Sequence, residues 1–292
     1  MPESSYNKTR IAPTPSGFLH LGNVLSFAIT AALAQKHQAK ILLRIDDLDR
    51  ARVNEQYLQD VFDTLSFLGI TWDEGPRDVR DFEDNYSQRH RMPIYRQAME
   101  QLFDEGLVFA CTCSRKQTNS DAADSCTCLD QQIPLNTENG NWRLISNNCT
   151  ALRVKTYPGQ VIDAVLPAEM LNFIVKKKDG FPSYQLTSLI DDLFYGIDLV
   201  IRGDDLLPST LAQHQLAMAL GKSDFKGITF YHHPLIMETS GKKLSKSAGA
   251  TSVKYLRENG HSAADIYTLI ATMMRVEQPV NNWQQLSELI NI

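Results

Sequence analysis

The chain of 292 residues lacks several features that would place it in a common protein class. No apolar run reaches the length of a bilayer-spanning helix, so residues 24–34 are interpreted as a buried helix of a globular protein. The first residues carry neither the basic nor the apolar region of a secretory signal, which predicts a cytoplasmic protein without a membrane partner. Internal repeats and low-complexity tracts are also missing.

An excess of positive charge is missing as well. The formal net charge is −5, which argues against a surface coated in basic residues for non-specific nucleic-acid binding. A local basic stripe could still contact RNA, and residues 176–178 (KKK) and the lysines around residue 242 are the candidates. With 43% hydrophobic and 22% charged residues, the chain can form one large or two modest globular domains.

Two common nucleotide-binding motifs are absent. Neither the GxGxxG fingerprint nor the GxxxxGK(S/T) loop occurs, which argues against a dehydrogenase and against a P-loop protein. Residues 10–23 (RIAPTPSGFLHLGN) instead predict a short strand, a loop broken by proline and glycine, and the start of a helix. A helix N-terminus suits an anion, Gly22 permits close approach, and His20 can donate to a phosphate oxygen. Taken alone, the stretch fits a buried helix start with an incidental histidine better.

A second stretch, residues 241–249 (GKKLSKSAG), sets several ammonium groups and two hydroxyls between glycines. This composition fits a loop that closes over a polyphosphate, although most lysine-rich loops are merely solvated surface.

Two predicted strands end in charged residues. Residues 40–45 (KILLRI) lead into residues 46–49 (DDLD), and residues 198–201 (DLVI) lead into residues 202–205 (RGDD). Open α/β sheets bind their ligands at the carboxyl ends of parallel strands. For residues 46–49 a turn rich in aspartate is the equally weighted alternative. Capping and stop residues predict helices that begin after Asn54, near Pro93, at Ser209 or Thr210, at Ser262 and near Trp283.

Four of the five cysteines form two close pairs, Cys111 with Cys113 and Cys126 with Cys128. In a reducing compartment such pairs more often bind metal than form disulfides. The surrounding residues 107–170 are poor in apolar side chains, so a zinc ion held by four thiolates would replace a core there. Buried thiols without a metal are the alternative. Cys149 is predicted to be a small buried residue.

Together, residues 20–23 (HLGN) and 243–247 (KLSKS) resemble the paired HIGH and KMSKS signatures of class I aminoacyl-tRNA synthetases, in the same order and with a wide separation. Further segments resemble the glutamyl-tRNA synthetase catalytic domain: residues 10–17 (RIAPTPSG), 43–47 (LRIDD), 72–76 (WDEGP) and 201–204 (IRGD). The resemblance extends from Thr9 to Ala248. It implies an α/β fold, the Rossmann-type nucleotide-binding domain of this class, with an inserted metal-binding subdomain and a short helical C-terminal part.

The resemblance also implies domain bounds and site residues. Residues 1–106 and 171–237 would be the two halves of the Rossmann domain, residues 107–170 the insertion, and residues 238–292 the KLSKS loop with the helical region. Glutamate would be bound by Arg10, Ala12, Thr14, Asp46, Tyr184 and Arg202, with Arg202 on its side-chain carboxylate. ATP would be bound by His20, Gly22, Asn23, Lys243, Ser245 and Lys246. His20, Lys243 and Lys246, with Mg²⁺, would stabilise charge on the phosphates in the transition state.

The sequence departs from the family pattern at three places. Asp46 stands where the family usually has glutamate and the glutaminyl relatives have aspartate. Asn23 replaces the last histidine of the first signature. The family's metal site uses three cysteines and a tyrosine, whereas here the implied zinc ligands are the four cysteines Cys111, Cys113, Cys126 and Cys128.

The acceptor is predicted from family likeness. Only residues 250–292 follow the lysine-rich loop, too few for the anticodon-binding domain of a glutamyl enzyme. The chain therefore resembles a free-standing, monomeric branch of the family, which activates glutamate without tRNA and attaches it to queuosine in the anticodon stem-loop of tRNA(Asp). The alternatives are a truncated glutamyl-tRNA synthetase that charges a tRNA 3′ end and a synthetase-like binding protein without catalysis.

Overall fold

The computed structural model describes residues 5–49, 52–113, 126–146, 149–236, 252–276 and 278–290. The chain divides into two compact units. The first unit comprises residues 1–90, 197–204 and 231–292, and the second comprises residues 91–196 and 205–230. None of the helices in the described part of the chain has both the length and the apolar character needed to cross a bilayer.

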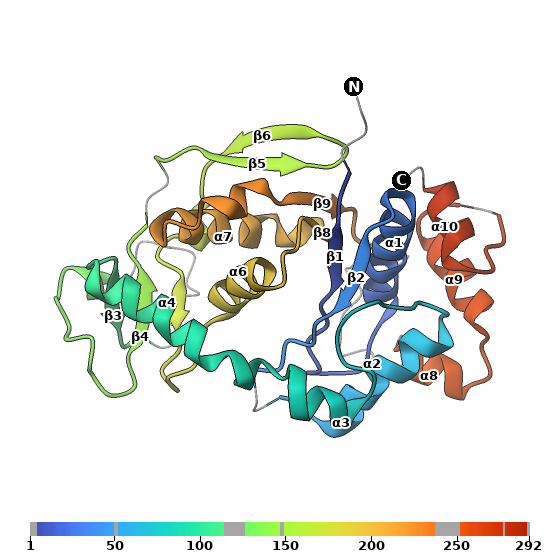
Figure 1. Cartoon of the computed structure of the whole chain (residues 1–292), viewed down its shortest axis with the longest axis horizontal. Coiled ribbons are helices and arrows are strands. Elements are labelled where there is room, and N and C mark those ends of the chain that lie inside the picture. Colours follow the sequence, from blue (N-terminus) through green and yellow to red (C-terminus); the bar gives the residue numbers. More distant parts are fainter. Residues whose placement is uncertain are drawn as a thin grey trace. The chain divides into compact units, whose positions relative to one another are not determined.

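The first unit is built on three parallel strands in the order β2-β1-β8 (Figure 1). These are β1 (Lys8–Ile11), β2 (Lys40–Leu43) and β8 (Leu199–Gly203). The order continues with β9 (Thr229–His233), whose last three residues belong to this unit. All five residues of β8 are buried. Strands are thus confirmed at both predicted places, with the continuous apolar character of a covered parallel sheet, although β2 ends at Leu43 and β8 runs from Leu199 to Gly203.

Helix α1 (Leu21–His37) packs against β1, β2 and β8, and α9 (Ala263–Met273) and α10 (Trp283–Leu289) also contact it (Figure 1). Eleven of its seventeen residues are buried, because the sheet and the C-terminal helices both cover it. This confirms the buried helix predicted at residues 24–34. The helix start predicted at Ser262 is also confirmed, since Ser262 and Asp265 form a capping box that opens α9.

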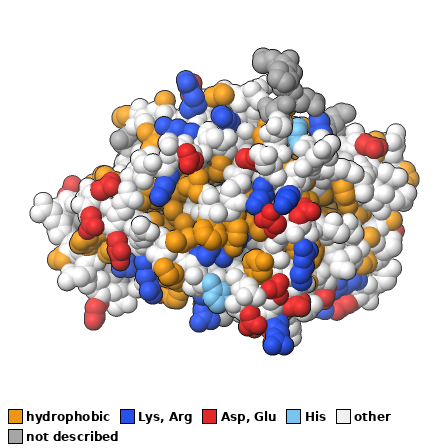
Figure 2. All heavy atoms as spheres, in the orientation of Figure 1, with side chains coloured by type: hydrophobic (Ala, Val, Ile, Leu, Met, Phe, Trp, Pro, Cys, Tyr) orange, Lys and Arg blue, Asp and Glu red, His pale blue; other side chains and the backbone are white. Residues whose placement is uncertain are grey.

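Among its described residues, the first unit also contains the α-helices α2 (Glu55–Phe67), α3 (Val79–Asp81) and α8 (Val253–Glu258). Asn54 caps α2 as predicted, since its side chain accepts a hydrogen bond from the Gln56 N–H at 2.8 Å. Helices α2 and α8 pack against each other. Acidic and basic side chains are interspersed on the face that Figure 2 draws, which agrees with the modest net charge.

The second unit contains an antiparallel sheet in the order β3-β4-β7, formed by β3 (Val108–Cys111), β4 (Asn141–Leu144) and β7 (Ile174–Lys176). A hairpin of β5 (Leu152–Thr156) and β6 (Gln160–Ala164) is also present, and β5 pairs in parallel with Thr229 and Phe230. The α-helices in the described part of this unit are α4 (Met92–Asp104), α6 (Tyr184–Phe194) and α7 (Leu207–Ala219).

A buried ion pair joins α6 to the start of α4. The guanidinium of Arg91 donates from Nε and Nη2 to the two carboxylate oxygens of Asp191, at 2.8 and 3.0 Å. The Tyr95 hydroxyl donates to the same carboxylate at 2.5 Å. Both charged side chains are almost fully buried, so the bidentate geometry fixes the orientation of α6 within this unit.

Two local predictions are wrong. Ser209 and Thr210 do not cap α7, because the helix begins earlier, at Leu207, with Pro208 in its first turn. The Ser209 hydroxyl instead accepts a hydrogen bond from Gln185 at 3.1 Å. Cys149 is exposed rather than buried, because it lies in the connection between β4 and β5 and not in a packed core.

We expect Gly75→Ala to destabilise the fold strongly. Gly75 has φ +106°, and a Cβ atom there would lie 2.2 Å from the Leu43 carbonyl oxygen of β2. Backbone cannot move aside cheaply, so the free energy of unfolding should fall by about 3 kcal/mol or more. Gly69 is the matched control, since its φ is +67° but open space surrounds the added Cβ. Gly69→Ala should cost about 1 to 2 kcal/mol. Urea unfolding measures both, and equal losses would contradict the steric argument.

Candidate active site

The predicted glutamate-binding residues of the first unit lie at one edge of its parallel sheet. The backbone of residues 44–46 runs beside that of residues 11–13, since the Asp46 N–H donates to the Pro13 carbonyl at 2.9 Å. Arg10 lies on β1 and donates from Nη1 to the Ile201 carbonyl of β8 at 3.3 Å. Arg202 follows on β8 and is 4% exposed. Adjacent parallel strands therefore bring Arg10, Asp46 and Arg202 to their shared carboxyl edge, with Ala12 and Thr14 in the loop after β1.

Arg44 is a neighbour of Asp46 that the sequence reasoning missed. Its Nε and Nη2 donate to the two oxygens of the Asp46 carboxylate at 2.8 and 3.1 Å, and both side chains are buried. Gln88 adds a longer bond to the same carboxylate at 3.4 Å. The spacing of Arg44 and Asp46 was a usable signal, because alternate residues of an extended segment point to the same side, and these two directly follow β2. Gln88 is distant in sequence and gave none.

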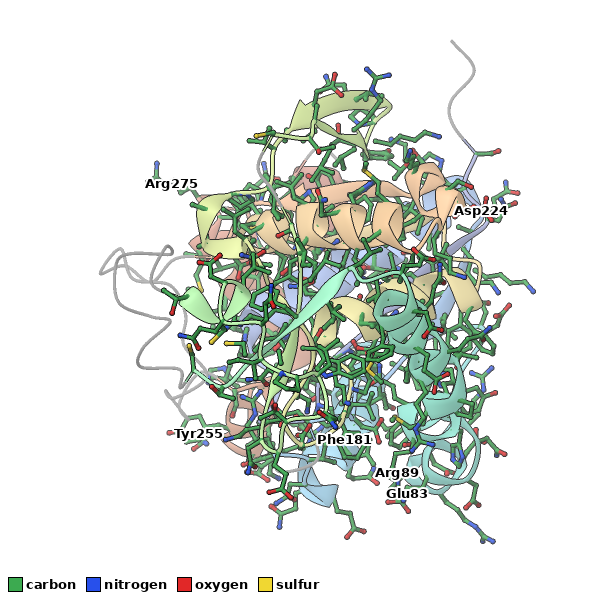
Figure 3. All side chains as sticks on the ribbon, turned by 90° about the vertical axis from the view of Figure 1, so that its left-hand side faces the viewer. Glu83, Arg89, Phe181, Asp224, Tyr255 and Arg275 are labelled. Carbon is green, nitrogen blue, oxygen red and sulfur yellow. The ribbon has the colours of Figure 1, made fainter. Side chains whose placement is uncertain are left out.

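Asp47 has a structural role. Its carboxylate accepts hydrogen bonds from the Ser87 hydroxyl at 2.6 Å and from the Gln88 N–H at 2.9 Å. Gln88 is buried, whereas the next residue, Arg89, lies at the surface (Figure 3). For Asp47, the alternative of a turn aspartate is therefore closer to the observed geometry, and the turn at residues 87–88 supports the segment that carries Asp46.

His20 occupies the N-cap of α1. Its Nδ1 accepts a hydrogen bond from the Gly22 N–H at 3.1 Å, and its backbone N–H donates to the Asn23 side chain at 3.0 Å. Because Nδ1 is the acceptor, the proton of the neutral ring sits on Nε2, which is the atom that can donate to a phosphate oxygen. The Gly22 N–H that the sequence suggested for a ligand is bonded to this ring, and Asn23 closes the capping box.

The lysines of the second signature, Lys243 and Lys246, and also Ser245, lie outside the described residues. The chain on either side of them contacts α1. Before them, His233 at the end of β9 bonds to Ser26 of α1 at 2.7 Å. After them, Ser252 forms an antiparallel bridge with His20, and the Val253 N–H donates to the Leu19 carbonyl at 2.8 Å.

Tyr184 belongs to the second unit and His232 to the first. Tyr184 is the first residue of α6, in the second unit, and its side chain is 41% exposed. His232 is half-buried on β9, the strand next to β8 in the sheet order. Burial, together with the positive charge of Arg202, lowers the pKa of His232 to about 3. His232 is therefore neutral at physiological pH and adds no second positive charge beside Arg202.

The four paired cysteines meet in the second unit, where all four sulfur atoms lie within 4.8 Å of one another. The Sγ atom of Cys113 lies 3.8 Å from the Sγ of Cys126 and 3.4 Å from the Sγ of Cys128. The Sγ atoms of Cys111 and Cys126 lie 3.6 Å apart. These distances are too long for disulfides. Four sulfurs placed tetrahedrally at the usual zinc–sulfur distance would be about 3.8 Å apart. The cluster thus has the dimensions of a tetrahedral metal site.

The chemistry of the cluster also fits a cation. Burial and the neighbouring thiols raise the pKa of Cys113 to about 12. Burial opposes ionisation of Cys111 too, but the Cys113 backbone N–H and the Arg143 guanidinium outweigh it, so the pKa of Cys111 is lowered. Crowded thiols resist ionisation because their charges repel, and a bound metal ion removes that repulsion by ligating the thiolates.

A groove of about 520 Å³ lies elsewhere on the first unit, and none of the predicted site residues lines it. Its guanidinium groups are engaged within the protein. Arg77 lies over the Trp72 ring and donates to backbone carbonyls, while Arg257 lies over the Phe67 ring. The groove therefore does not mark the candidate active site.

Comparison with known proteins identifies the family. A family model described as tRNA synthetases class I (E and Q), catalytic domain, matches residues 7–290. The chain belongs to this family. The α/β fold predicted from the two signatures is confirmed, and the four-cysteine cluster could bind a metal within it.

Individual relatives in this synthetase family are similar to the chain over most of its length. The glutamate–tRNA ligase of Dehalococcoides mccartyi is 32% identical over 273 residues, which are 87% of this chain and 53% of the relative. That of Coprothermobacter proteolyticus is 29% identical and covers 99% of this chain and 63% of the relative. The chain therefore spans about half to two thirds of the length of these curated relatives.

Solved synthetase structures share the fold. The glutamate–tRNA synthetase of Elizabethkingia anophelis superposes with a TM-score of 0.72 at 21% identity, covering 97% of this chain and 65% of that one. A glutamate–tRNA ligase from Elizabethkingia meningosepticum, solved in complex with its amino acid, has the same TM-score at 20% identity.

We expect the purified chain to carry about one zinc ion, held by the four cysteines. Substituting Cys111→Ser and Cys126→Ser together should release the metal and lower the melting temperature, because within the described ranges the apolar cluster around the cysteines contains just Phe109 and Ile133 besides them. Cys149→Ser is the matched control, since Cys149 is exposed and lies outside the cluster. Elemental analysis and thermal melting measure the two effects. Metal-free protein, or equal loss from the control, would contradict the ligand assignment.

Proposed function

We propose that the chain activates L-glutamate with ATP in the absence of tRNA and transfers the glutamate to queuosine in the anticodon loop of tRNA(Asp). This is the activity of a glutamyl-Q tRNA(Asp) synthetase. The observation that carries the activation step is the gathering of Arg10, Asp46 and Arg202 at one sheet edge, in the unit in which His20 caps α1. The relatives named glutamate–tRNA ligase support the choice of amino acid.

Glutamate carries two carboxylates and one ammonium group, and the residues at this edge match those charges. In our proposal Arg202 binds the side-chain carboxylate, and Arg10 donates to the α-carboxylate. Asp46, held by Arg44, binds the α-ammonium together with the hydroxyl of Tyr184. Ala12 and Thr14 line the pocket. A buried guanidinium left without an anion is costly, so Arg202 favours glutamate over neutral glutamine.

The chemical step needs little covalent participation from the protein. The α-carboxylate oxygen of glutamate attacks the α-phosphorus of ATP, and the bond to the β-phosphate oxygen breaks, which gives glutamyl-adenylate and pyrophosphate. The Nε2–H of His20 donates to the phosphates, and Lys243 and Lys246 neutralise the charge that spreads over them. Gly22, Asn23 and Ser245 would line the ATP site. Mg²⁺ bound with ATP supplies further neutralisation of the phosphate charge.

The transfer step moves the glutamyl group to a hydroxyl of the nucleoside. That hydroxyl attacks the adenylate carbonyl carbon, the bond from this carbon to the phosphate oxygen breaks, and AMP leaves with the oxygen. The choice of queuosine rests on the resemblance of the chain, including its cysteine site, to the free-standing branch of the family. In this proposal the chain acts as a monomer, and residues 107–170 form the inserted subdomain, in which zinc has a structural role.

Pyrophosphate exchange tests the activation step. Without any tRNA, the chain should catalyse exchange of pyrophosphate into ATP that depends on glutamate and not on glutamine. The activated glutamate should then be transferred to tRNA(Asp) that contains queuosine and not to the same tRNA with guanosine at that position. Exchange that requires tRNA(Glu), followed by charging of its 3′ end, would indicate a truncated glutamyl-tRNA synthetase instead. Absence of exchange under all conditions would indicate a binding protein.

Arg202→Ala tests the amino-acid site. We expect kcat/KM for glutamate in the exchange reaction to fall by about a hundredfold or more, because a buried charge pair is lost, while ATP still binds. Arg153→Ala is the matched control. Arg153 is exposed on the β5–β6 hairpin and forms an exposed ion pair with Asp163 of the same hairpin, so its loss should leave exchange unchanged. Normal glutamate activation by the Arg202 variant would refute the assigned role.

A further inference from the structure

A side-chain hydrogen bond joins the helix of the first signature to the strand that leads toward the second. His233 is the last residue of β9 and is 2% exposed. Its Nε2 lies 2.7 Å from the hydroxyl oxygen of Ser26, which is on α1 one turn beyond Gly22. All of these residues belong to the first unit.

The direction of this hydrogen bond follows from its neighbours. The Nδ1 of His233 lies 2.9 Å from the Pro234 carbonyl oxygen, which can only accept, so Nδ1 carries a proton. In a neutral ring Nε2 is then the acceptor, and the Ser26 hydroxyl donates to it. That hydroxyl also lies 3.2 Å from the Gly22 carbonyl, but it has only one proton. The shorter distance assigns the proton to the bond with His233.

The Ser26–His233 bond lies just before the lysine segment in the chain. His233 precedes residues 237–251, which hold the lysines of the second signature, and Ser252 and Val253 follow them. The two following residues contact His20 and Leu19 through the backbone, at the start of α1. The Ser26–His233 bond is the counterpart on the preceding side. The residues that flank the lysine segment on both sides therefore contact the N-terminal part of α1, at its cap and at the turn that follows Gly22.

We propose that His233 is a positioning residue for ATP. It acts through Ser26 and holds the start of α1 at a fixed distance from the strand that leads into the lysine segment. The inference rests on the proposed function, because ATP is the ligand that both signatures would contact. A directional bond suits this role, since an apolar pair would fill the space without fixing the separation.

The test compares Ser26→Ala, His233→Leu and the double variant with the unchanged chain. The exchange reaction gives KM for ATP and for glutamate, and calorimetry gives the dissociation constant for ATP. Each single substitution should raise both ATP constants by about tenfold, as expected for the loss of a buried hydrogen bond. KM for glutamate should stay within twofold. The double variant should bind ATP no more weakly than the single variant with the larger loss, because both substitutions remove the same hydrogen bond.

Two further variants separate positioning from general damage. His233→Gln can still accept from Ser26 and should restore ATP binding to within about threefold of the unchanged chain. Thr30→Val removes a hydroxyl from the next turn of α1, where Thr30 donates to the Ser26 carbonyl of the same helix, and it should have no effect on ATP.

Additive losses, an equal rise in both KM values, or the same loss from Thr30→Val would overturn the proposal. A chain that binds ATP but catalyses no exchange would refute the proposed function, while the calorimetric comparison would still decide the role of His233. A chain that does not bind ATP would overturn both.

Discussion

The return of the backbone to the start of α1 is the contact on which the rest of the candidate site depends. The Val253 N–H bonds to the Leu19 carbonyl, and Ser252 pairs with His20. Bringing such distant segments together costs chain entropy, and burial of α9 and α10 against α1 offsets that cost. The C-terminal helices therefore do more than complete the core, because they hold the residues beyond the lysine segment against the turn that carries His20.

Buried charges at the sheet edge are arranged in fixed pairs. Arg44 and Asp46 form a bidentate contact, and Asp47 binds the turn at Ser87 and Gln88. Such pairs contribute little net stability, because desolvation offsets the attraction, but they fix side-chain orientation. The same device joins α4 and α6 through Arg91 and Asp191. Fixed orientation would suit the proposed glutamate pocket, which has to distinguish a carboxylate from an amide of the same shape.

The cysteine cluster shows how a short, polar segment can be organised without a large core. Four sulfur atoms lie together beside Phe109 and Ile133, at separations that match tetrahedral coordination of a metal ion. The strands β3, β4 and β7 place Cys111 at the end of a strand whose register is fixed by β4. The close spacing of the cysteines in the sequence does not by itself form the cluster. The pairing of β3 with β4 also fixes the position of Cys111.

The sequence by itself determined the features that depend on neighbouring residues. Short-range rules predicted the Asn54 and Ser262 caps, the buried helix α1 and the apolar strands β2 and β8. They also singled out the two close pairs of cysteines, and the two signatures indicated the family. Local rules failed at Ser209, where Pro208 allows an earlier helix start, and at Cys149, whose exposure depends on the path of a connection. Only the tertiary structure decided that Gln88 supports Asp46, that His233 bonds to Ser26, and that Ser252 meets His20. These partners are far apart in sequence, and their contacts arise from strand order and helix packing, which no local pattern encodes.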